Sequence, residues 1–325
     1  MDIREIREFL SAPLKEVGVV TEEALRSDIA LLSATNRSLL AQGGKQMRPI
    51  LSLLSAGAAG GINPDSVRFA AASELLHNAT LLHDDVVDEA RERRGKPTVM
   101  SILGGRASVL LGDFWLVRAV RCILEAAHGS SRVISLFAKT LSDLAEGELL
   151  QMQKASSADT TREDYLRIIY SKTASLFETA AVSGAVSAGV PEEWVSALGD
   201  YARLLGLAFQ VKDDIFDYAG GAEVGKPVGV DLLEQKITLP LLCALDSVSD
   251  GEAAAVRRKV SRIVDRPEEA EEVRRFVLER GGIGAAEAEM GKMIDKAVLS
   301  LGILPDSAEK SYLVGLARYV GERTY

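Results

Sequence analysis

The chain of 325 residues carries 47 acidic and 38 basic side chains, which gives a formal net charge of -9, and 47% of its residues are hydrophobic. The acidic balance argues against a nucleic-acid partner, because duplex binding depends on a cationic surface that displaces counterions. Aromatic residues make up only 5% of the chain, and apolar residues recur at helical spacing. We therefore predict an all-α fold.

No segment of the sequence has the pattern of a signal peptide or a membrane span. The first ten residues, MDIREIREFL, carry charges of both signs and lack an apolar run followed by a cleavage site. Residues 49–64 are uncharged but too short and too rich in glycine to cross a bilayer. We expect a cytoplasmic protein whose two cysteines, Cys122 and Cys243, are buried thiols, since two are too few for a disulfide framework or a metal cluster.

Two helices in the first two-thirds of the chain are bounded by clear end signals. Residues 63–65, Asn-Pro-Asp, supply an N-cap, a proline at the first helical position and an acid in the first turn, which predicts a helix reaching about Ala90. Residues 161–164 resemble a capping box, with aspartate in the place usually taken by glutamate or glutamine. They predict a helix that runs to Gly189, before Pro191.

A further helix is predicted from near residue 191 to about Tyr218, where Gly220-Gly221 ends it. The mixed charges of residues 257–280 predict an exposed helix. The sequence contains no repeat of fixed period and no seam that favours two domains. Long helices of this kind predict one helical bundle spanning residues 1–325.

One acidic pattern occurs twice, each time on a predicted apolar helix. The copies are Asp84-Asp85-Val86-Val87-Asp88 and Asp213-Asp214-Ile215-Phe216-Asp217. Residues four apart lie on one helix face, so the first and last aspartates of each copy project together. A single cluster of this kind is most often a solvated surface. Two clusters with apolar neighbours instead need cations, and Mg²⁺ suits them because it takes one or two carboxylates and completes its shell with water and substrate phosphate.

Other polar side chains share these helix faces. His77 precedes Asp84 by seven residues and Gln210 precedes Asp213 by three, so both point toward the acidic clusters, although a lone histidine is more often a core residue. The segment 43–49, Gly-Gly-Lys-Gln-Met-Arg-Pro, places two cations before a helix and suits an anion site without metal. The basic run of residues 91–96 is either a solvated charge run or a second anion contact.

At these residues the sequence resembles the trans-isoprenyl diphosphate synthase family, long-chain type. The shared pieces occur in family order over roughly residues 43–240. They are Gly44 to Pro49, His77 to Asp88, Arg93 to Thr98, Ser171-Lys172-Thr173, Phe209-Gln210, the second acidic motif, Gly225-Lys226-Pro227, Asp231 and Lys236. Terpene cyclases differ, because their second metal motif is typically of an Asn/Ser/Glu type that is absent here.

The resemblance implies an isoprenoid synthase bundle around a central substrate cavity, with three Mg²⁺ ions on an allylic diphosphate. The implied metal ligands are Asp84, Asp85, Asp88, Asp213, Asp214 and Asp217. The residues implied to contact the allylic diphosphate are Arg93, Lys172 and Lys226. Those implied to bind isopentenyl diphosphate are Lys45, Arg48, His77 and Arg94. The residues implied to orient groups around the allylic cation are Lys172, Thr173, Gln210 and Lys236.

The resemblance further implies a homodimer, a polyprenyl product for a quinone side chain, and transient membrane contact when that product is released. Two alternatives stay open: a short-chain synthase that makes farnesyl or geranylgeranyl diphosphate, and a non-catalytic subunit of a heteromeric synthase. Short-chain relatives usually carry a bulky ring just before the first motif, where this chain has Ala79 and Thr80. We therefore expect a long product and a tunnel floor deeper than Ala79, for which the helix that contains Phe114, Val117 and Val120 is one candidate.

Overall fold

The computed structural model describes residues 3–93, 95–127, 131–219 and 229–323, and it confirms the all-α prediction. The helices of the first half are α1 (Ile3–Phe9), α2 (Ser11–Ala24), α3 (Ala30–Leu40), α4 (Met47–Ala58), α5 (Pro64–Val87), α6 (Val99–Leu103), α7 (Gly105–Ala127) and α8 (Ser131–Ser157). Those of the second half are α9 (Arg162–Ile169), α10 (Ser175–Ser187), α11 (Glu192–Ala219), α12 (Val230–Leu233), α13 (Leu239–Asp246), α14 (Asp250–Val260), α15 (Glu268–Glu279), α16 (Gly282–Ser300) and α17 (Ala308–Glu322).

The predicted helix starts are confirmed in detail. The side chain of Asn63 accepts hydrogen bonds from the amides of Asp65 and Ser66, both at 3.0 Å, and Pro64 is the first residue of α5. Thr161 and Asp164 form the reciprocal capping box at the start of α9, because each side chain accepts a hydrogen bond from the other residue's amide. The end of α5 is Val87, three residues before the predicted boundary.

Two other predictions need correction. The helix that begins after Thr161 is interrupted by a π-helical turn, η1 (Tyr170–Ala174), before it continues as α10. Residues 257–280 form parts of two helices, α14 and α15, because the chain is not helical over residues 261–267. The described chain also contains a two-residue antiparallel hairpin of β1 (Glu92–Arg93) and β2 (Lys96–Pro97), and a 3-10 turn, η2 (Leu301–Ile303).

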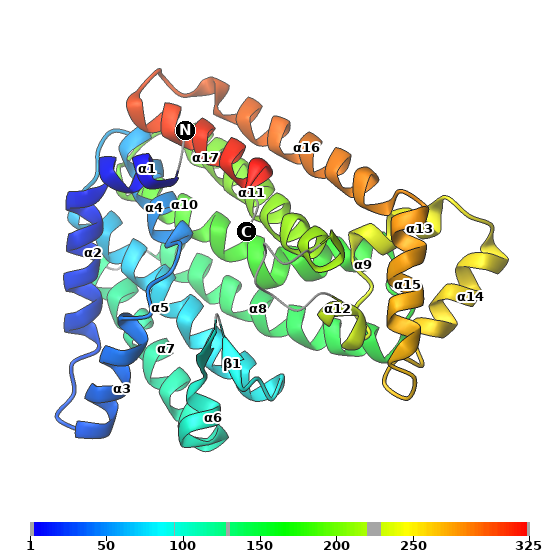
Figure 1. The fold of residues 1–325 in the computed structure, drawn as a ribbon. Helices are drawn as coiled ribbons and strands as arrows, with labels where there is room; N and C mark the ends of the chain where they lie inside the picture. The colour runs from blue at the N-terminus through cyan, green and yellow to red at the C-terminus, as the bar shows by residue number, and fades with distance from the viewer. Residues whose placement is uncertain (1–2, 94, 128–130, 220–228, 324–325) are drawn as a thin grey trace.

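The helix α10 lies at the centre of the bundle (Figure 1) and packs against α4, α5, α8 and α11. The long helix α5 also lies along α7, and α11 lies along α16. Both acidic motifs are therefore carried by direct neighbours of one central helix. This arrangement brings together two sequence motifs that are more than a hundred residues apart.

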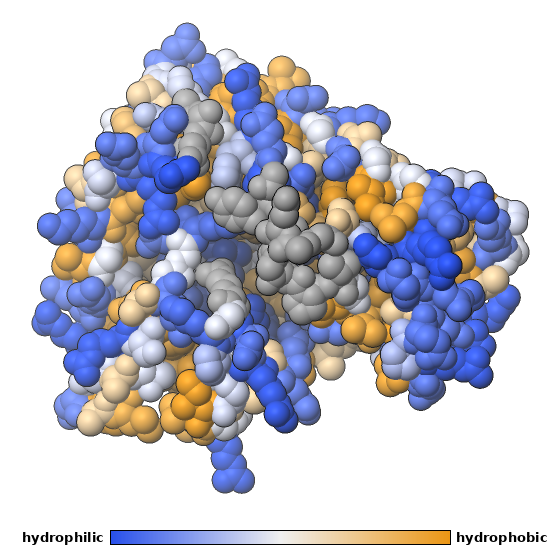
Figure 2. Space-filling view, viewed as in Figure 1, coloured by the Kyte–Doolittle hydropathy of each residue, from blue (hydrophilic) through white to orange (hydrophobic). Residues whose placement is uncertain are grey.

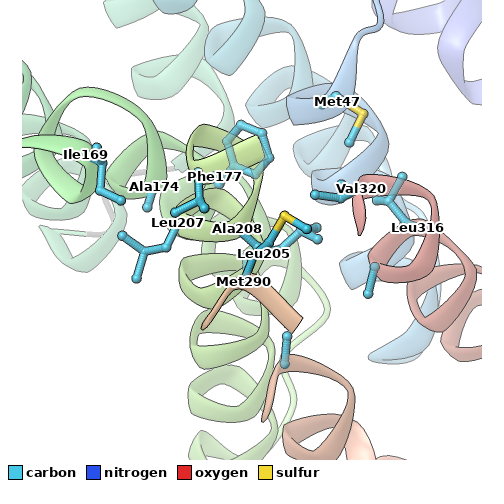
Figure 3. Close-up of a cluster of buried hydrophobic side chains, with 14 of the residues drawn as sticks. Met47, Ile169, Ala174, Phe177, Leu205, Leu207, Ala208, Met290, Leu316 and Val320 are labelled. Carbon is cyan, nitrogen blue, oxygen red and sulfur yellow. The ribbon is translucent and has the colours of Figure 1, made fainter. Parts of the chain in front are cut away.

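Two clusters of buried apolar side chains hold the bundle together. The larger one joins α4, α9, α10, α11, α16 and α17, and Figure 3 shows side chains from these helices converging around Phe177, Leu205 and Met290. The second lies around α5 and α7 and includes Trp115 and the tilted ring pair Phe69–Phe137. Each fully buried Leu or Phe contributes about 1.5–3 kcal/mol, so these clusters fix the relative positions of the motif helices.

The surface differs from one region to another. On the face drawn in Figure 2, hydrophilic side chains cover α14 and α15, and apolar side chains gather at the edge formed by α3 and α6. Cys122 and Cys243 are buried thiols, as predicted. None of the helices within the described ranges has the length and apolar character needed to cross a membrane.

The contact between α10 and α4 predicts a site that cannot accept a side chain. A Cβ atom on Gly184 would lie 2.2 Å from the carbonyl oxygen of Ser52, a backbone atom that cannot rotate away. We expect Gly184→Ala to lower the free energy of unfolding in urea by about 1–3 kcal/mol, the usual cost of overpacking. The matched control is Gly18→Ala, because no atom lies within 4 Å of a Cβ at that position in α2. An equal effect of the two substitutions would contradict the packing argument.

Candidate active site

The first acidic motif occupies the last turn of α5. The carboxylate of Asp84 is partly buried and forms no hydrogen bond or ion pair with any residue in the described ranges. Asp85 is buried, and Nε of Arg93 donates to its Oδ1 at 2.8 Å. Asp88 caps the helix, and its amide donates to the carbonyl of Asp84 at 2.8 Å. The motif therefore leaves the side chains of Asp84 and Asp88 available for a ligand.

The second motif occupies the last turns of α11. Nη2 of Arg323 donates to Oδ1 of Asp213 at 2.8 Å. The two carboxylate oxygens of Asp217 accept hydrogen bonds from the amides of Val230, at 3.0 Å, and Asp231, at 3.2 Å. Asp217 thereby fixes the first turn of α12 against the motif.

The middle aspartate of each motif belongs to the scaffold. Asp214 is buried and accepts hydrogen bonds from Oη of Tyr165 at 2.7 Å and from Nε2 of Gln210 at 2.9 Å. Oγ1 of Thr173 donates in turn to Oε1 of Gln210 at 2.9 Å. Burial raises the pKa of Asp214 to about 8. Like Asp85 in the first motif, Asp214 positions neighbouring side chains. It accepts a hydrogen bond from Gln210, which in turn accepts one from Thr173.

Lys236 acts on both motifs. Burial raises the pKa values of Asp88 in the first motif and Asp217 in the second, and the charge of Lys236 opposes both shifts. Burial also disfavours the charge on Lys236, but Asp231, Glu234 and Asp88 together outweigh it, so the pKa of Lys236 is raised. Because one ammonium group senses the acids of both motifs, the two motifs share one electrostatic environment.

Lys172 stands on the π-helical turn η1, beside the first motif. Its Nζ pairs with Oε2 of Glu148 on α8 at 2.5 Å. The preceding residue, Gly147, permits this approach, since a Cβ there would lie 2.5 Å from Cβ of Ser171 and 3.1 Å from Cγ of Lys172. Burial raises the pKa of Asp84 to about 6, Lys172 opposes the shift, and Glu148 adds to it. A π-turn at a functional residue is a recurrent feature of proteins.

Glu148, Arg323 and Tyr165 are three side chains of this site that the sequence analysis missed. Glu148 and Tyr165 lie on helices that carry no recognised motif, and only their burial against η1 and α11 reveals them. Arg323 lies beyond the last strong helical signal of the chain, where a basic residue is ordinarily solvated. No pattern in the sequence distinguishes it from an exposed arginine.

Two of the four residues assigned to isopentenyl diphosphate, Lys45 and Arg48, lie on elements that carry neither acidic motif. Lys45 belongs to the loop before α4, and Nη1 of Arg7 fixes this loop by donating to the carbonyl of Gly44 at 3.2 Å. Arg48, in the first turn of α4, lies with its guanidinium 5.0 Å from the ring centroid of Phe177. These two cations belong to α4 and the loop that precedes it, whereas the acidic motifs are carried by α5 and α11.

The remaining predicted positions fall into four groups. His77 is partly buried on α5, two turns before Asp84. Ala79 is fully buried in the second apolar cluster, and Oγ1 of Thr80 donates to the carbonyl of His77 at 2.8 Å. Arg94 and Lys226 lie outside the described residues. Val117 and Val120, on the helix that is one candidate for the tunnel floor, have exposed side chains.

The donor set suits a divalent cation that shares its coordination with a substrate. Within the described part of the chain, no three His, Cys, Asp or Glu side chains gather closely enough to form a complete protein site for a metal. Mg²⁺ needs only one or two carboxylates when a diphosphate supplies further oxygens. Asp84 fits this role, because burial raises its pKa and no described residue bonds to its carboxylate, so a bound cation would stabilise its charged form.

The raised pKa of Asp84 predicts a pH-dependent stability in the metal-free protein. Its pKa of about 6 in the folded state lies above the ordinary 3.8, so the folded state binds the proton more tightly, and the free energy of unfolding falls as pH rises from about 4 to about 6. In urea titrations with EDTA, we expect Asp84→Asn to add on the order of 1–2 kcal/mol at pH 7 and little at pH 4. The exposed Asp295→Asn on α16 is the control. A gain for Asp84→Asn that is the same at both pH values would contradict the assignment.

Comparison with known proteins identifies relatives along the whole chain. The family model described as Polyprenyl synthetase matches residues 29–279. The octaprenyl diphosphate synthase of Escherichia coli (strain K12) is 38% identical over 324 residues, which cover 99% of each chain. A decaprenyl diphosphate synthase from Rhodobacter capsulatus has a similar structure, with a TM-score of 0.91 and 35% identity over the full length of both chains.

A second solved structure adds information on ligands. It is a polyprenyl synthase from Caulobacter crescentus CB15 complexed with calcium and isoprenyl diphosphate, with a TM-score of 0.90 and 36% identity over 100% of this chain and 98% of that one. The matching segment contains both acidic motifs together with Lys172 and Lys236. The match over most of its length, joined to an all-α bundle that brings the two motifs together, shows that the chain belongs to the polyprenyl synthetase family.

Proposed function

We propose that the chain is a prenyltransferase that condenses isopentenyl diphosphate with an allylic diphosphate to make a long-chain all-trans polyprenyl diphosphate. The observation that carries this proposal is the pair of aspartate motifs at the ends of α5 and α11, both of which lie close enough to Lys236 for its charge to stabilise their carboxylates. The octaprenyl and decaprenyl synthases among its relatives support the long product. We further propose that it acts in the cytoplasm as one domain over residues 1–325 and supplies quinone side chains.

The allylic diphosphate binds where the acids are crowded. Asp84, Asp88 and Asp213 are the leading candidates to hold three Mg²⁺ ions there, with Asp85, Asp214 and Asp217 supporting the motif geometry. Bound metal supplies Lewis-acid stabilisation of the departing diphosphate. The calcium and isoprenyl diphosphate bound to the Caulobacter relative support a divalent cation together with this class of substrate. Arg93, Lys172 and Lys226 add charged hydrogen bonds to the same diphosphate.

Isopentenyl diphosphate keeps its diphosphate throughout the reaction, so its site needs charge without a Lewis acid. Lys45, Arg48, His77 and Arg94 are the proposed contacts. The C–O bond of the allylic substrate breaks, and diphosphate leaves with the electron pair. The double bond of isopentenyl diphosphate then attacks the allylic carbon, and a proton passes to the departed diphosphate.

The side chains around the reacting carbons act through their dipoles and charge. Thr173 and Gln210 form a hydrogen-bonded pair anchored on the buried Asp214, so their oxygen atoms are preorganised before the substrate binds. Preorganised dipoles stabilise a developing cation without reorganisation during the reaction. Lys172 and Lys236 orient the diphosphate and limit the repulsion among the aspartates.

The decisive experiment is turnover by the purified chain with magnesium, labelled isopentenyl diphosphate and a short allylic primer. We expect Asp84→Ala and Asp213→Ala to lower turnover by at least a hundredfold with the fold intact, since each removes a carboxylate from the diphosphate site. Asp295→Ala is the exposed control. An inactive wild-type chain that becomes active only with a second polypeptide would favour the subunit alternative.

The small residue at position 79 predicts the length of the product. Ala79 lies 1% exposed in the apolar cluster that includes Leu75, Leu76 and Leu82, on the interior side of α5. We expect wild type to make products on the heptaprenyl-to-decaprenyl scale and Ala79→Phe to shorten them toward geranylgeranyl or farnesyl diphosphate. Chromatographic sizing of dephosphorylated products measures this. A short wild-type product, or an active mutant whose product is unchanged, would refute the gate and favour the short-chain alternative.

A row of exposed apolar side chains on α7 supports the proposed homodimer. Leu110, Val117 and Leu124 are 69%, 58% and 51% exposed. They recur every seven residues, so they lie on one face of the helix, as in helices that pair with a neighbour. A second copy of the same face would bury all three residues of each chain.

This row predicts which substitutions separate the subunits. We expect Leu110→Asp combined with Val117→Asp to convert the protein from dimer to monomer, because each buried carboxylate would lack a partner. Light scattering coupled to size-exclusion chromatography gives the mass. Leu299→Asp, at another highly exposed position on α16, is the control and should leave the mass unchanged. A monomeric wild type would refute the dimer.

A further inference from the structure

Arg323 follows the last residue of α17 and places its side chain on the second acidic motif. The side chain is only 2% exposed. Its Nη2 donates both to the carbonyl of Phe209 and to Oδ1 of Asp213, each at 2.8 Å. Its backbone amide continues the helical pattern by donating to the carbonyl of Tyr319 at 2.9 Å. The end of α17 is therefore tied directly to a proposed metal ligand.

One face of α11 provides side chains that suit the guanidinium of Arg323. The centre of the guanidinium lies 4.0 Å from the ring centroid of Phe209 and 5.3 Å from that of Phe216. Phe209, Asp213 and Phe216 follow one another at intervals of four and three residues, so they share one helix face. Two aromatic faces and one carboxylate together suit an arginine, which combines a planar charge with a stacking surface.

The burial of Arg323 depends on the charge of Asp213. A buried guanidinium is unfavourable unless an acid compensates it, and within the described ranges Asp213 is the acid that pairs with it. Nε of Arg323 is buried and has no hydrogen-bond partner there, so the aromatic rings and a single carboxylate supply most of the compensation. A cation that binds the Asp213 carboxylate would neutralise its charge. It would therefore weaken the ion pair that stabilises the buried guanidinium of Arg323.

Without a bound ligand, the first aspartates of the two motifs therefore differ in their ion pairing. Among the residues that the structure describes, Asp84 has no directly bonded cation, whereas Asp213 has one, Arg323. We propose that Arg323 is a positioning residue that acts as the resident counter-ion of Asp213 and competes with a divalent cation for that carboxylate, so that loading the second motif loosens the last turn of α17. This inference rests on the proposed metal role of Asp213. On this inference a metal ion binds first at the first motif, where no described side chain competes with it for Asp84.

Calorimetric titration of the full chain with Mg²⁺ in the presence of inorganic diphosphate tests the competition. We expect Arg323→Gln, which removes the charge, to lower the Kd of the weaker metal step about threefold to tenfold. Arg323→Lys keeps the charge and should bind metal as wild type does. Arg318→Gln, an exposed position on the same helix, is the matched control. Circular dichroism verifies that each variant is folded.

A double-mutant cycle assigns the effect to Asp213. In an Asp213→Asn background, Arg323→Gln should leave the remaining Mg²⁺ affinity unchanged, because the contested carboxylate is gone. Hydrogen exchange gives a second readout: amides of residues 316–323 should exchange faster once Mg²⁺ and diphosphate bind wild type, and no such acceleration should occur in Asp213→Asn.

The outcomes separate the inference from the function on which it rests. Weaker or unchanged Mg²⁺ binding in Arg323→Gln, with normal binding in wild type, would overturn the counter-ion role alone. An equal effect of Arg323→Gln and Arg323→Lys would also overturn it, because geometry rather than charge would then decide. Failure of wild type to bind Mg²⁺ with diphosphate would overturn the proposed metal role of Asp213 and the inference with it.

Discussion

Repulsion between like charges at the ends of α5 and α11 is the constraint on which the site depends. Burial raises the pKa values of Asp84, Asp88 and Asp217 because their charged forms are poorly solvated there and lie near other acids. The protein compensates only in part, through Lys172 and Lys236. The remaining negative charge favours a ligand that brings cations with it, and a diphosphate with divalent metal is such a ligand.

Within each motif, the middle aspartate bonds to the surrounding fold and thereby keeps the outer aspartates close together. Asp85 on α5 is buried and bonded to Arg93, and Asp214 on α11 is buried and bonded to Tyr165 of α9, so neither motif helix can rotate without breaking a bond to another element. The outer aspartates are held in place as a consequence. Close helix contacts reinforce the arrangement, because Gly147 brings α8 against the π-turn that carries Lys172.

The two motifs share a sequence pattern but differ in their surroundings. A short hairpin follows the first motif and supplies Arg93, whereas the end of α17 meets the second and supplies Arg323. One arginine therefore pairs with the middle aspartate of its motif and the other with the first. This asymmetry gives the two acidic motifs different electrostatic surroundings.

The sequence by itself determined the helical class, the starts of α5 and α9, and the two acidic motifs. Capping, proline placement and four-residue spacing are local rules that act within one or two turns of a helix. The tertiary structure alone decided which aspartates are scaffold and which are open, because that depends on partners such as Tyr165, Glu148 and Arg323, which lie 24 to 110 residues away from the residues they bond. It likewise decided the π-turn, the break between α14 and α15, and the outward direction of Val117 and Val120, since each follows from which neighbouring helix or solvent a side chain meets.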